Sequence, residues 1–373
     1  MISVLPVSHT LYIDVSLHSV SVALVEKGAL SSLHTVRATR STHFPDSRHF
    51  HKTLVAIRVR AQELIEILCR EYKVKQYSIV FTVHAPLCSS RSIQHTYAFK
   101  GDTTITKLHI QEVLESARKA TAETNSAGTS SVFREYMTGV ALNGYHTDTP
   151  IGKVAHEATC TIIQESLAGG VQKAVIEPLS RGGTSYEIHN YAQLVGMMLG
   201  GLHTEAGATF ALCEIAPESF EISVYTKRTM THQVTLPVGG RRLLEGVRAH
   251  LGITHEFVEG LLRLHADGTL TDDVRSSLTA FIEQSAQELK AVLQQQSSGV
   301  VMFPARMFLI TERHHEHFWV SVLSKALDNP SLVPEKIVFD AKHIAYMAVH
   351  AEHMLLAIYA HVTTDPKATA LPV

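Results

Sequence analysis

The stretch Thr209–Gly240, TFALCEIAPESFEISVYTKRTMTHQVTLPVGG, constrains the fold of this chain more than any other segment. It opens with the apolar run Thr209–Glu214, which is rich in strand-forming residues. Apolar residues at the spacing of a strand then recur in Ile222–Tyr225 and Gln233–Leu236, with the polar turn Thr226–Thr229 between them. The pattern predicts a strand, a tight bend and a hairpin.

A second hairpin is predicted near the start of the chain, at Leu11–Glu26, LYIDVSLHSVSVALVE, where apolar residues alternate with small or polar ones. The segment His49–Tyr72 follows it and carries apolar residues at helical spacing, and Tyr77–Val83 has the composition of a strand. The first part of the chain therefore has the order strand, hairpin, helix, strand.

These two hairpins resemble the phosphate-binding hairpins of actin-like ATPases, and within that superfamily the chain is most similar to the bacterial FtsA and PilM group. The most specific similarity is LNGYHTDTPIGK, Leu142–Lys153, which resembles a motif in the inserted domain of that group, where a turn precedes an Asn/Thr-Pro-x-Gly step. Its Asn-Gly pair is a strong turn signal, although any hairpin can carry one.

The resemblance implies an α/β protein with the two-lobed actin-like ATPase fold, made of two ribonuclease H-like halves and a small inserted α+β domain of the SHS2 type. The expected divisions are residues 1–99 and 186–206 for the first lobe, 100–185 for the inserted domain, 207–340 for the second lobe, and 341–373 for a closing helix and tail.

Helical spacing predicts further helices, among them one in which Leu108 faces inward with three other apolar residues. The predicted helices are Ile105–Thr121, Gln164–Leu179, Tyr186–Leu202, Arg241–Leu251, Thr254–Leu264, Thr271–Gln296 and Ala341–His361. Ala85–Ser92 is expected to be a loop that leads into the inserted domain, and short strands are expected at Val300–Phe303 and Met307–Ile310.

In actin-like ATPases the hairpins place glycine N–H groups against the nucleotide phosphates, and acidic side chains position Mg²⁺. The resemblance assigns ten residues to such a site. They lie in the two hairpins, at the junction between a strand and the helix after it, and at two positions expected to contact the nucleoside. These residues are Asp14, Ser16 and Ser19, then Glu214, Ser219 and Glu221, then Gly239 and Gly240, and finally Glu259 and Thr311.

Several of these positions depart from the family pattern. Ser16 stands where the first hairpin has a glycine, Ala216 adds a methyl group to the second, and Pro217 has no N–H to donate. Leu262 falls where the family has a lysine for the nucleoside. We therefore expect ATP and Mg²⁺ to bind weakly or not at all, as in a pseudo-ATPase, and the alternative is that the hairpins only hold the two lobes together.

Composition limits the classes of function and the compartment. A net charge of −2 and a pI near 6.9 do not supply the basic field that nucleic-acid binding usually needs, so we expect no nucleic-acid partner. The four cysteines are far apart and form no CxxC pair, which fits a reducing cytoplasm. We found neither a signal peptide nor an apolar run of about 20 residues, so we expect a cytoplasmic protein.

The resemblance implies a cytoplasmic scaffold of a membrane-associated machine, either PilM-like in type IV pilus assembly or FtsA-like in cell division. Its partners would be proteins at the cytoplasmic face of the inner membrane, and self-association is left open. FtsA relatives end in an amphipathic membrane-targeting helix, which the tail TTDPKATALPV does not resemble, so the pilus role is favoured.

Two enzyme classes remain as alternatives. A phosphotransferase of the sugar or acetate kinase branch would need intact phosphate glycines and an acid over the acceptor hydroxyl. A metal hydrolase would need converging ligands, for which His314–His317 and the pair His350 and His353 are the densest sources. With 24 histidines in the chain, chance clustering accounts for such groups, and we expect them to be exposed polar residues.

Overall fold

The computed structural model describes residues 8–27, 34–44, 49–124, 130–147, 149–180, 184–202, 209–226, 229–236, 238–296, 304, 306–311, 315–327, 344–346, 358 and 361. The chain divides into two compact units. The first comprises Met1–Gly201, Arg228–Met230 and Asp340–Val373, and the second comprises Leu202–Lys227 and Thr231–Phe339.

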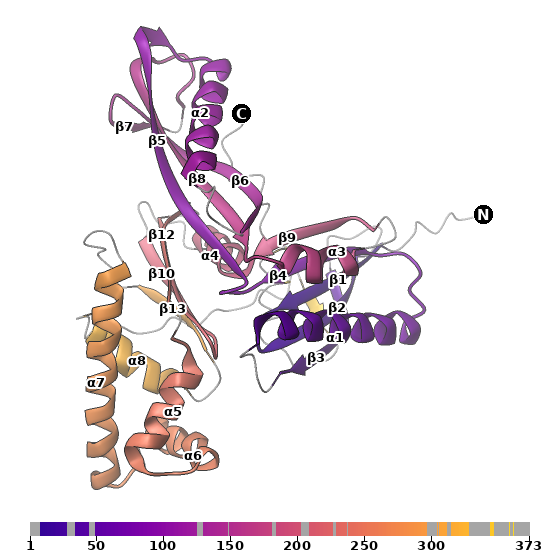
Figure 1. Ribbon diagram of the computed structural model, residues 1–373, viewed down its shortest axis with the longest axis vertical. Helices are drawn as coiled ribbons and strands as arrows, with labels where there is room; N and C mark the ends of the chain where they lie inside the picture. The colour runs from indigo at the N-terminus through magenta and orange to yellow at the C-terminus, as the bar shows by residue number, and fades with distance from the viewer. Residues whose placement is uncertain are drawn as a thin grey trace. The chain divides into compact units, whose positions relative to one another are not determined.

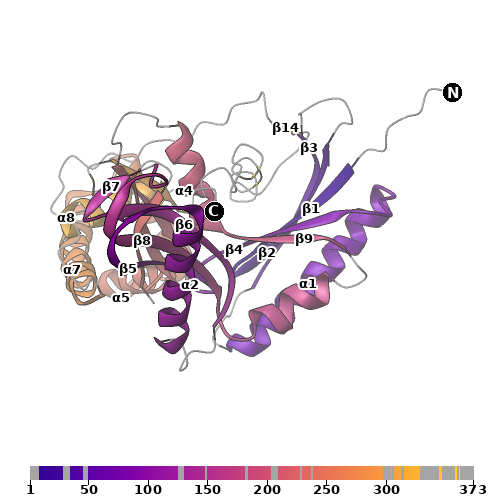
Figure 2. The same ribbon diagram turned by 90° about the horizontal axis from the view of Figure 1, so that it is seen from above.

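The main sheet of the first unit has the strand order β14-β3-β2-β1-β4-β9. Its strands are β1 (Ser8–Val15), β2 (Ser19–Lys27), β3 (His34–His43), β4 (Ser78–Val83), β9 (Tyr186–Asn190) and β14 (Ile344–Tyr346). The strands β1, β2 and β3 form an antiparallel meander, whereas β4 runs parallel to β1 and β9 parallel to β4. Helix α1 (Phe50–Glu71) lies along this sheet and buries its apolar stripe in the same core (Figures 1 and 2). The predicted hairpin, helix and strand are confirmed.

A second sheet of the first unit has the order β5-β8-β6-β7 and carries helix α2 (Lys107–Thr124). Its strands are β5 (Cys88–Thr104), β6 (Ser131–Leu142), β7 (Tyr145–Thr147) and β8 (Val154–Leu167). Asn143 and Gly144 form the predicted turn, with φ of 51° and 82°, in the left-handed region that these two residues tolerate. This sheet spans Cys88–Leu167, whereas the range expected for the inserted domain was 100–185.

Helix α2 packs on this sheet through Val113, Leu114 and Ala117, as predicted, but not through Leu108. Leu108 is 62% exposed, so its predicted inward position is wrong. The buried stripe has the i, i+3, i+4, i+7 spacing of one helix face and consists of Ile110, Val113, Leu114 and Ala117. Leu108 lies outside this stripe, so the buried face of α2 begins at Ile110.

Three predicted elements in this unit have a different structure. Ala85–Ser92 is not a loop throughout, because β5 begins at Cys88. Gln164–Leu179 is not one helix, because β8 continues to Leu167 and is followed by a π-helical turn and the short helix α3 (Glu177–Leu179). Tyr186–Asn190 is strand β9, and helix α4 (Tyr191–Leu202) begins only after it. The last six residues of β8 are all buried, although Gln164, Glu165 and Ser166 are polar. This segment therefore lacks the alternation of apolar and polar residues that indicates a half-buried strand.

The sheet of the second unit has the order β12-β11-β10-β13. Its strands are β10 (Thr209–Ile215), β11 (Phe220–Thr226), β12 (Thr229–Leu236) and β13 (Met307–Ile310). One face packs against four helices, which are α5 (Gly240–Leu251), α6 (His255–Ala266), α7 (Asp272–Gln296) and α8 (Glu316–Ala326). The predicted strands and the first three helices are confirmed. Helix α8 was not predicted, and it places Phe318, Trp319, Val322 and Leu323 in the core.

The predicted closing helix Ala341–His361 is wrong at Ile344–Tyr346, which forms strand β14 parallel to β3. Ile358 and His361 are helical, and the rest of that prediction, including His350 and His353, lies outside the described residues, as does the predicted strand Val300–Phe303. Within the described ranges, we find no helix with the length and apolarity needed to span a membrane.

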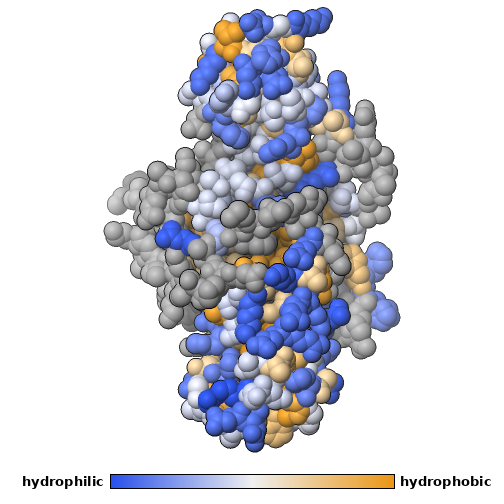
Figure 3. Space-filling model, turned by 90° about the vertical axis from the view of Figure 1, so that its left-hand side faces the viewer, coloured by the Kyte–Doolittle hydropathy of each residue, from blue (hydrophilic) through white to orange (hydrophobic). Residues whose placement is uncertain are grey.

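Hydrophilic residues cover much of the face drawn in Figure 3, and apolar patches lie between them. On the β5–β8 sheet and its helix, the exposed apolar side chains include Leu108, Val132, Tyr145, Ile151 and Val154. Tyr145, directly after the Asn-Gly turn, is 80% exposed.

Candidate functional site

The first hairpin holds Asp14 at the end of β1, where its side chain is buried. The Thr82 hydroxyl donates a hydrogen bond to Asp14 Oδ1 at 2.6 Å, and His84 Nε2 lies 2.8 Å from the same oxygen. The His84 ring stacks on Tyr191, with 3.9 Å between the ring centroids. Asp14 is thus held in a buried network that joins β1, the end of β4 and the start of α4.

The bend of this hairpin is closed by its own two serines. The backbone N–H of Ser16 donates to the Ser19 carbonyl at 3.0 Å, and the Ser19 N–H donates to the Ser16 hydroxyl at 3.0 Å. The two hydroxyl oxygens lie 2.9 Å apart, and His18 Nδ1 is 3.2 Å from that of Ser16. Both serines therefore stabilise the bend, and Ser16 is buried.

The second hairpin places two acidic residues opposite each other on β10 and β11. Glu214 and Glu221 are partners in the antiparallel register and are 4% and 2% exposed. Glu221 accepts hydrogen bonds from Thr235 at 3.2 Å and from Ser223 at 3.4 Å. Directly opposed side chains share one face of a sheet, so both carboxylates lie on the face that does not carry the α5–α8 core. Carboxylates so placed are of the type that could hold a divalent cation.

The bend between β10 and β11 packs against the N-terminus of α5. The backbone N–H groups of Gly240 and Arg241 donate to the carbonyls of Ala216 and Pro217 at 2.9 and 3.0 Å. A Cβ atom on Gly239 would overlap the Pro217 carbonyl and the Ser219 nitrogen, so glycine is required there by close backbone approach. The Arg241 side chain forms an ion pair of 2.8 Å with Glu218. The first N–H groups of α5 are thus used by the chain itself.

Glu259, the acidic residue predicted to contact the nucleoside, lies on α6. Its carboxylate contacts His315, one of the residues in the histidine-rich segment His314–His317. His315, directly before α8, is buried, and its Nε2 lies 3.0 and 3.1 Å from the two carboxylate oxygens of Glu259. The expectation that this histidine is exposed is wrong, because it packs beneath α6 at the start of α8, whereas His317 is exposed as expected. Thr311 follows β13 and is partly buried, and His314 lies outside the described residues.

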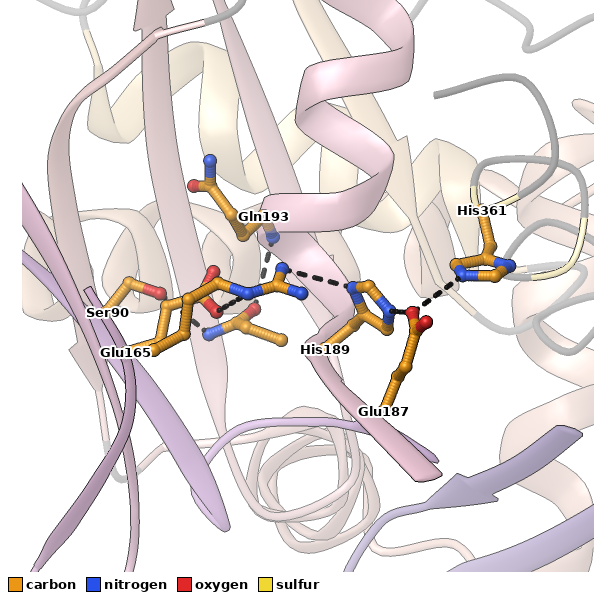
Figure 4. A network of polar contacts seen from close by, with 8 residues as sticks. Ser90, Glu165, Glu187, His189, Gln193 and His361 are labelled. Carbon is orange, nitrogen blue, oxygen red and sulfur yellow. Dashed lines mark hydrogen bonds and ion pairs between the residues drawn. The ribbon is translucent and has the colours of Figure 1, made fainter. Parts of the chain in front are cut away.

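A polar network that sequence patterns did not indicate lies at β9 in the first unit (Figure 4). Glu187 Oε2 is 3.3 Å from His189 Nε2 and 3.4 Å from His361 Nε2. Arg134 NH1 lies 3.1 Å from His189 Nδ1, and its Nε lies 3.8 Å from Glu165. An E-x-H pair in a strand is the one local signal for this network, and the partners are distant in the sequence.

Burial sets the protonation of this network. It lowers the pKa of His189 to about 4, with Glu187 acting in the opposite direction, so this imidazole is neutral at neutral pH. Hydrogen bonds from His189 and His361 hold the pKa of Glu187 well below its usual range. Burial raises the pKa of the Glu165 carboxyl to about 7, and the charge of Arg134 opposes that rise.

Comparisons with known proteins give structural but no sequence matches. No protein-family model and no curated protein matches the chain. A chain of a PilM–PilN type IV pilus biogenesis complex superposes with a TM-score of 0.62 over 96% of this chain and 99% of that chain, at 15% identity. The chain has the two-lobed actin-like ATPase fold, with a small inserted α+β domain.

Two further solved structures have lower scores. The ethanolamine utilization protein EutJ from Carboxydothermus hydrogenoformans gives a TM-score of 0.41 at 12% identity, over 97% of this chain and 92% of that chain. Component A of the (R)-2-hydroxyglutaryl-CoA dehydratase of Acidaminococcus fermentans gives 0.40 at 9% identity, over 97% and 99%.

Within this fold the residues predicted for the nucleotide site, apart from Thr311, form three local groups. The groups are Asp14 with Ser16 and Ser19, the second hairpin with Gly239 and Gly240, and Glu259 beside His315. Their assignment to nucleotide stays a prediction. Thr82 and His84 at Asp14, and Arg241 at the second bend, are contacts that the sequence did not indicate.

Proposed function

We propose that this protein is a cytoplasmic actin-like scaffold that binds protein partners of a type IV pilus machine at the inner membrane, and that it hydrolyses ATP slowly or not at all. The partner part of this proposal is supported by the full-length match to a chain of the PilM–PilN type IV pilus biogenesis complex. A role in cell division of the FtsA type is the alternative.

The proposal that nucleotide binds weakly rests on one observation, which is that backbone N–H groups at the two bends donate hydrogen bonds within the chain. In phosphate hairpins these donors must be available to the ligand. Here the N–H groups of Ser16 and Ser19 in the first bend and of Ala216 in the second donate to other groups of the chain. The N–H groups of Gly240 and Arg241, at the start of α5, donate to carbonyls of the second bend. Pro217 adds a position with no donor. A phosphate at either bend would have to break these backbone hydrogen bonds or use other donors.

We assign partner binding to the inserted domain. This part of the chain carries the Asn-Gly hairpin and several large apolar side chains at its surface, including Tyr145 at 80% and Val154 at 57% exposure. Tyrosine is enriched among the residues that contribute most of the binding free energy in protein interfaces. We propose that these side chains, rather than the two hairpins, provide the contacts with the pilus partner.

The proposal is tested by calorimetric titration of the purified protein with two synthetic peptides. One peptide is the cytoplasmic segment of the PilN-type protein encoded in the same genome, and the other is the tail of the tubulin-like division protein. We expect saturable binding of the first only. Binding of the division peptide alone would move the assignment to the FtsA type, and binding of neither would reject the scaffold role in both machines.

A deletion variant locates the binding surface. Cys88 and Leu167 are register partners, and the Ala168 N–H donates to the Leu87 carbonyl at 2.8 Å, so the two chain ends left by removal of residues 89–166 are adjacent. A two-residue Asn-Gly hairpin can join them. We expect this variant to fold and to lose peptide binding. A double variant, Tyr145→Ser with Val154→Ser, should weaken binding without the deletion, and full affinity in both variants would contradict the assignment.

A further inference from the structure

Three metal-ligating side chains converge beside β9 in the first unit. Glu187 and His189 are two residues apart on a strand and so share one face, and His361 comes from the C-terminal part of the chain. Figure 4 shows the imidazoles of His189 and His361 pointing toward the Glu187 carboxylate from opposite sides. One ligand atom of each residue lies within 4.8 Å of the other two.

The spacing of these atoms fits a tetrahedral zinc site. Zinc binds histidine nitrogen and carboxylate oxygen at about 2.0–2.2 Å, so two ligand atoms of a tetrahedral site are about 3.3–3.6 Å apart. Glu187 Oε2 lies 3.3 Å from His189 Nε2 and 3.4 Å from His361 Nε2. Ordinary N–H···O bonds are shorter, with a mode near 2.9–3.0 Å. Two edges of the tetrahedron are therefore in place, and the His189–His361 edge needs to close from within 4.8 Å.

The second ring nitrogen of His361 already has a partner suited to a metal ligand. His361 Nδ1 lies 2.8 Å from the Tyr12 hydroxyl, which can accept its proton and leave Nε2 unprotonated. Tyr12 therefore fixes the orientation and tautomer of His361.

Arg134 is the group that must move. Its NH1 donates to His189 Nδ1 at 3.1 Å, which keeps the proton on Nε2, the atom a metal would use. The Glu165 carboxylate is 0% exposed, lies 3.8 Å from Arg134 Nε, and has no hydrogen-bond partner for either oxygen among the described residues. A short rotation of the guanidinium toward Glu165 would satisfy these oxygens and free His189 Nδ1 to carry the proton.

A cavity of about 400 Å³ adjoins the cluster, and Tyr12, Glu187 and His361 line it together with residues of β1 and β4. Two histidines and one carboxylate leave the fourth tetrahedral position unfilled, as in zinc sites that bind water or a small ligand. The cavity gives that position access to solvent. We propose that Glu187, His189 and His361 bind one zinc ion, with the fourth position open to this cavity.

The test is titration of Zn²⁺ into the tag-free, metal-stripped full-length protein by calorimetry, with metal content after dialysis measured by mass spectrometry. We expect one tightly held zinc per chain in the wild type and in the control His146→Ala, whose imidazole is exposed on β7. Loss of a ligand should weaken binding by at least about 100-fold, more than the loss of an outer-shell partner.

The ligand variants are His361→Ala and Glu187→Gln. The Glu187 side chain is 62% exposed, so Glu187→Gln should fold even if a histidine variant does not. Zinc should also raise the melting temperature of the wild type and the control but not of the two variants. The proposal is overturned if the wild type holds no zinc after dialysis, or if Glu187→Gln holds zinc as tightly as the control.

Discussion

The carbonyl of Pro217 occupies the space that a side chain at position 239 would need. This contact joins the bend of the second hairpin to the N-terminus of α5, and the same carbonyl accepts the N–H of Arg241. Gly239, one of the two glycines predicted for the nucleotide site, therefore has a structural requirement of its own, whereas a Cβ atom on Gly240 would make only ordinary contacts at 3.8 Å or more.

We expect Gly239→Ala to destabilise the second unit, because the added methyl group meets backbone atoms that cannot rotate away. The cost should be at least that of overpacking a core, about 1–3 kcal/mol in the free energy of unfolding. Urea denaturation followed by circular dichroism measures it. Gly260→Ala in α6 is the matched control, because nothing lies within 4 Å of its added carbon, and it should be neutral or stabilising. Equal effects of the two substitutions would contradict the packing argument.

We expect Mg-ATP to bind the wild type no more tightly than about millimolar. Each lost charge-assisted hydrogen bond removes about 1.5–3 kcal/mol, so two losses turn a micromolar site into a roughly millimolar one. Calorimetric titration tests this against the triple variant Ser16→Gly, Ala216→Gly, Pro217→Gly. Micromolar binding or turnover by the wild type would sink the pseudo-ATPase assignment, and binding gained only by the variant would support it.

His315 and Glu259 should be energetically coupled. His315→Ala empties a buried position and removes the hydrogen bond between α6 and the start of α8, for an expected loss of about 1–3 kcal/mol. Glu259→Ala should cost less, because the Glu259 side chain is 49% exposed and water replaces its partner. The double variant completes a thermodynamic cycle, and additive effects would show that the two side chains do not interact.

Stability should fall as pH rises through the titration range of Glu165. The Glu165 pKa is about 7 in the folded protein against 4.5 in the unfolded chain, so between these values the folded state binds more protons. The difference of 2.5 units corresponds to about 3 kcal/mol lost between pH 4.5 and pH 7 and no further change above it. Glu165→Gln should remove this loss and be more stable than the wild type at pH 8.

Urea denaturation of wild type and Glu165→Gln at pH 5 and pH 8, with a chelator present, checks this difference. Comparing the two proteins at each pH cancels the titration of other groups. If the stability gained by the substitution is the same at both pH values, Glu165 does not carry the predicted proton.

The sequence by itself determined the strands, turns and helices that can be identified from the spacing of neighbouring residues. The first hairpin alternates apolar residues with small or polar ones, and the second combines an apolar run with strand-forming residues at strand spacing. Asn143-Gly144 supplies the left-handed backbone of a tight turn. Helix α1 has a stripe with the helical period. The family resemblance at these hairpins then led to the fold, because the order of such elements along the chain restricts their arrangement.

Only the tertiary structure decided the features that depend on contacts between residues far apart in the sequence. The end of β8 and strand β9 are strands because they pair with β5 and with β4. The end of β8 mixes apolar and polar residues without a regular alternation, and the residues of neither segment indicate its distant partner. Leu108 is exposed because the sheet beneath α2 selects the stripe that starts at Ile110. His361 joins Glu187 across 174 residues, and His315 joins Glu259 across 56. Such contacts form only when separate elements pack, so no spacing in the sequence could predict them.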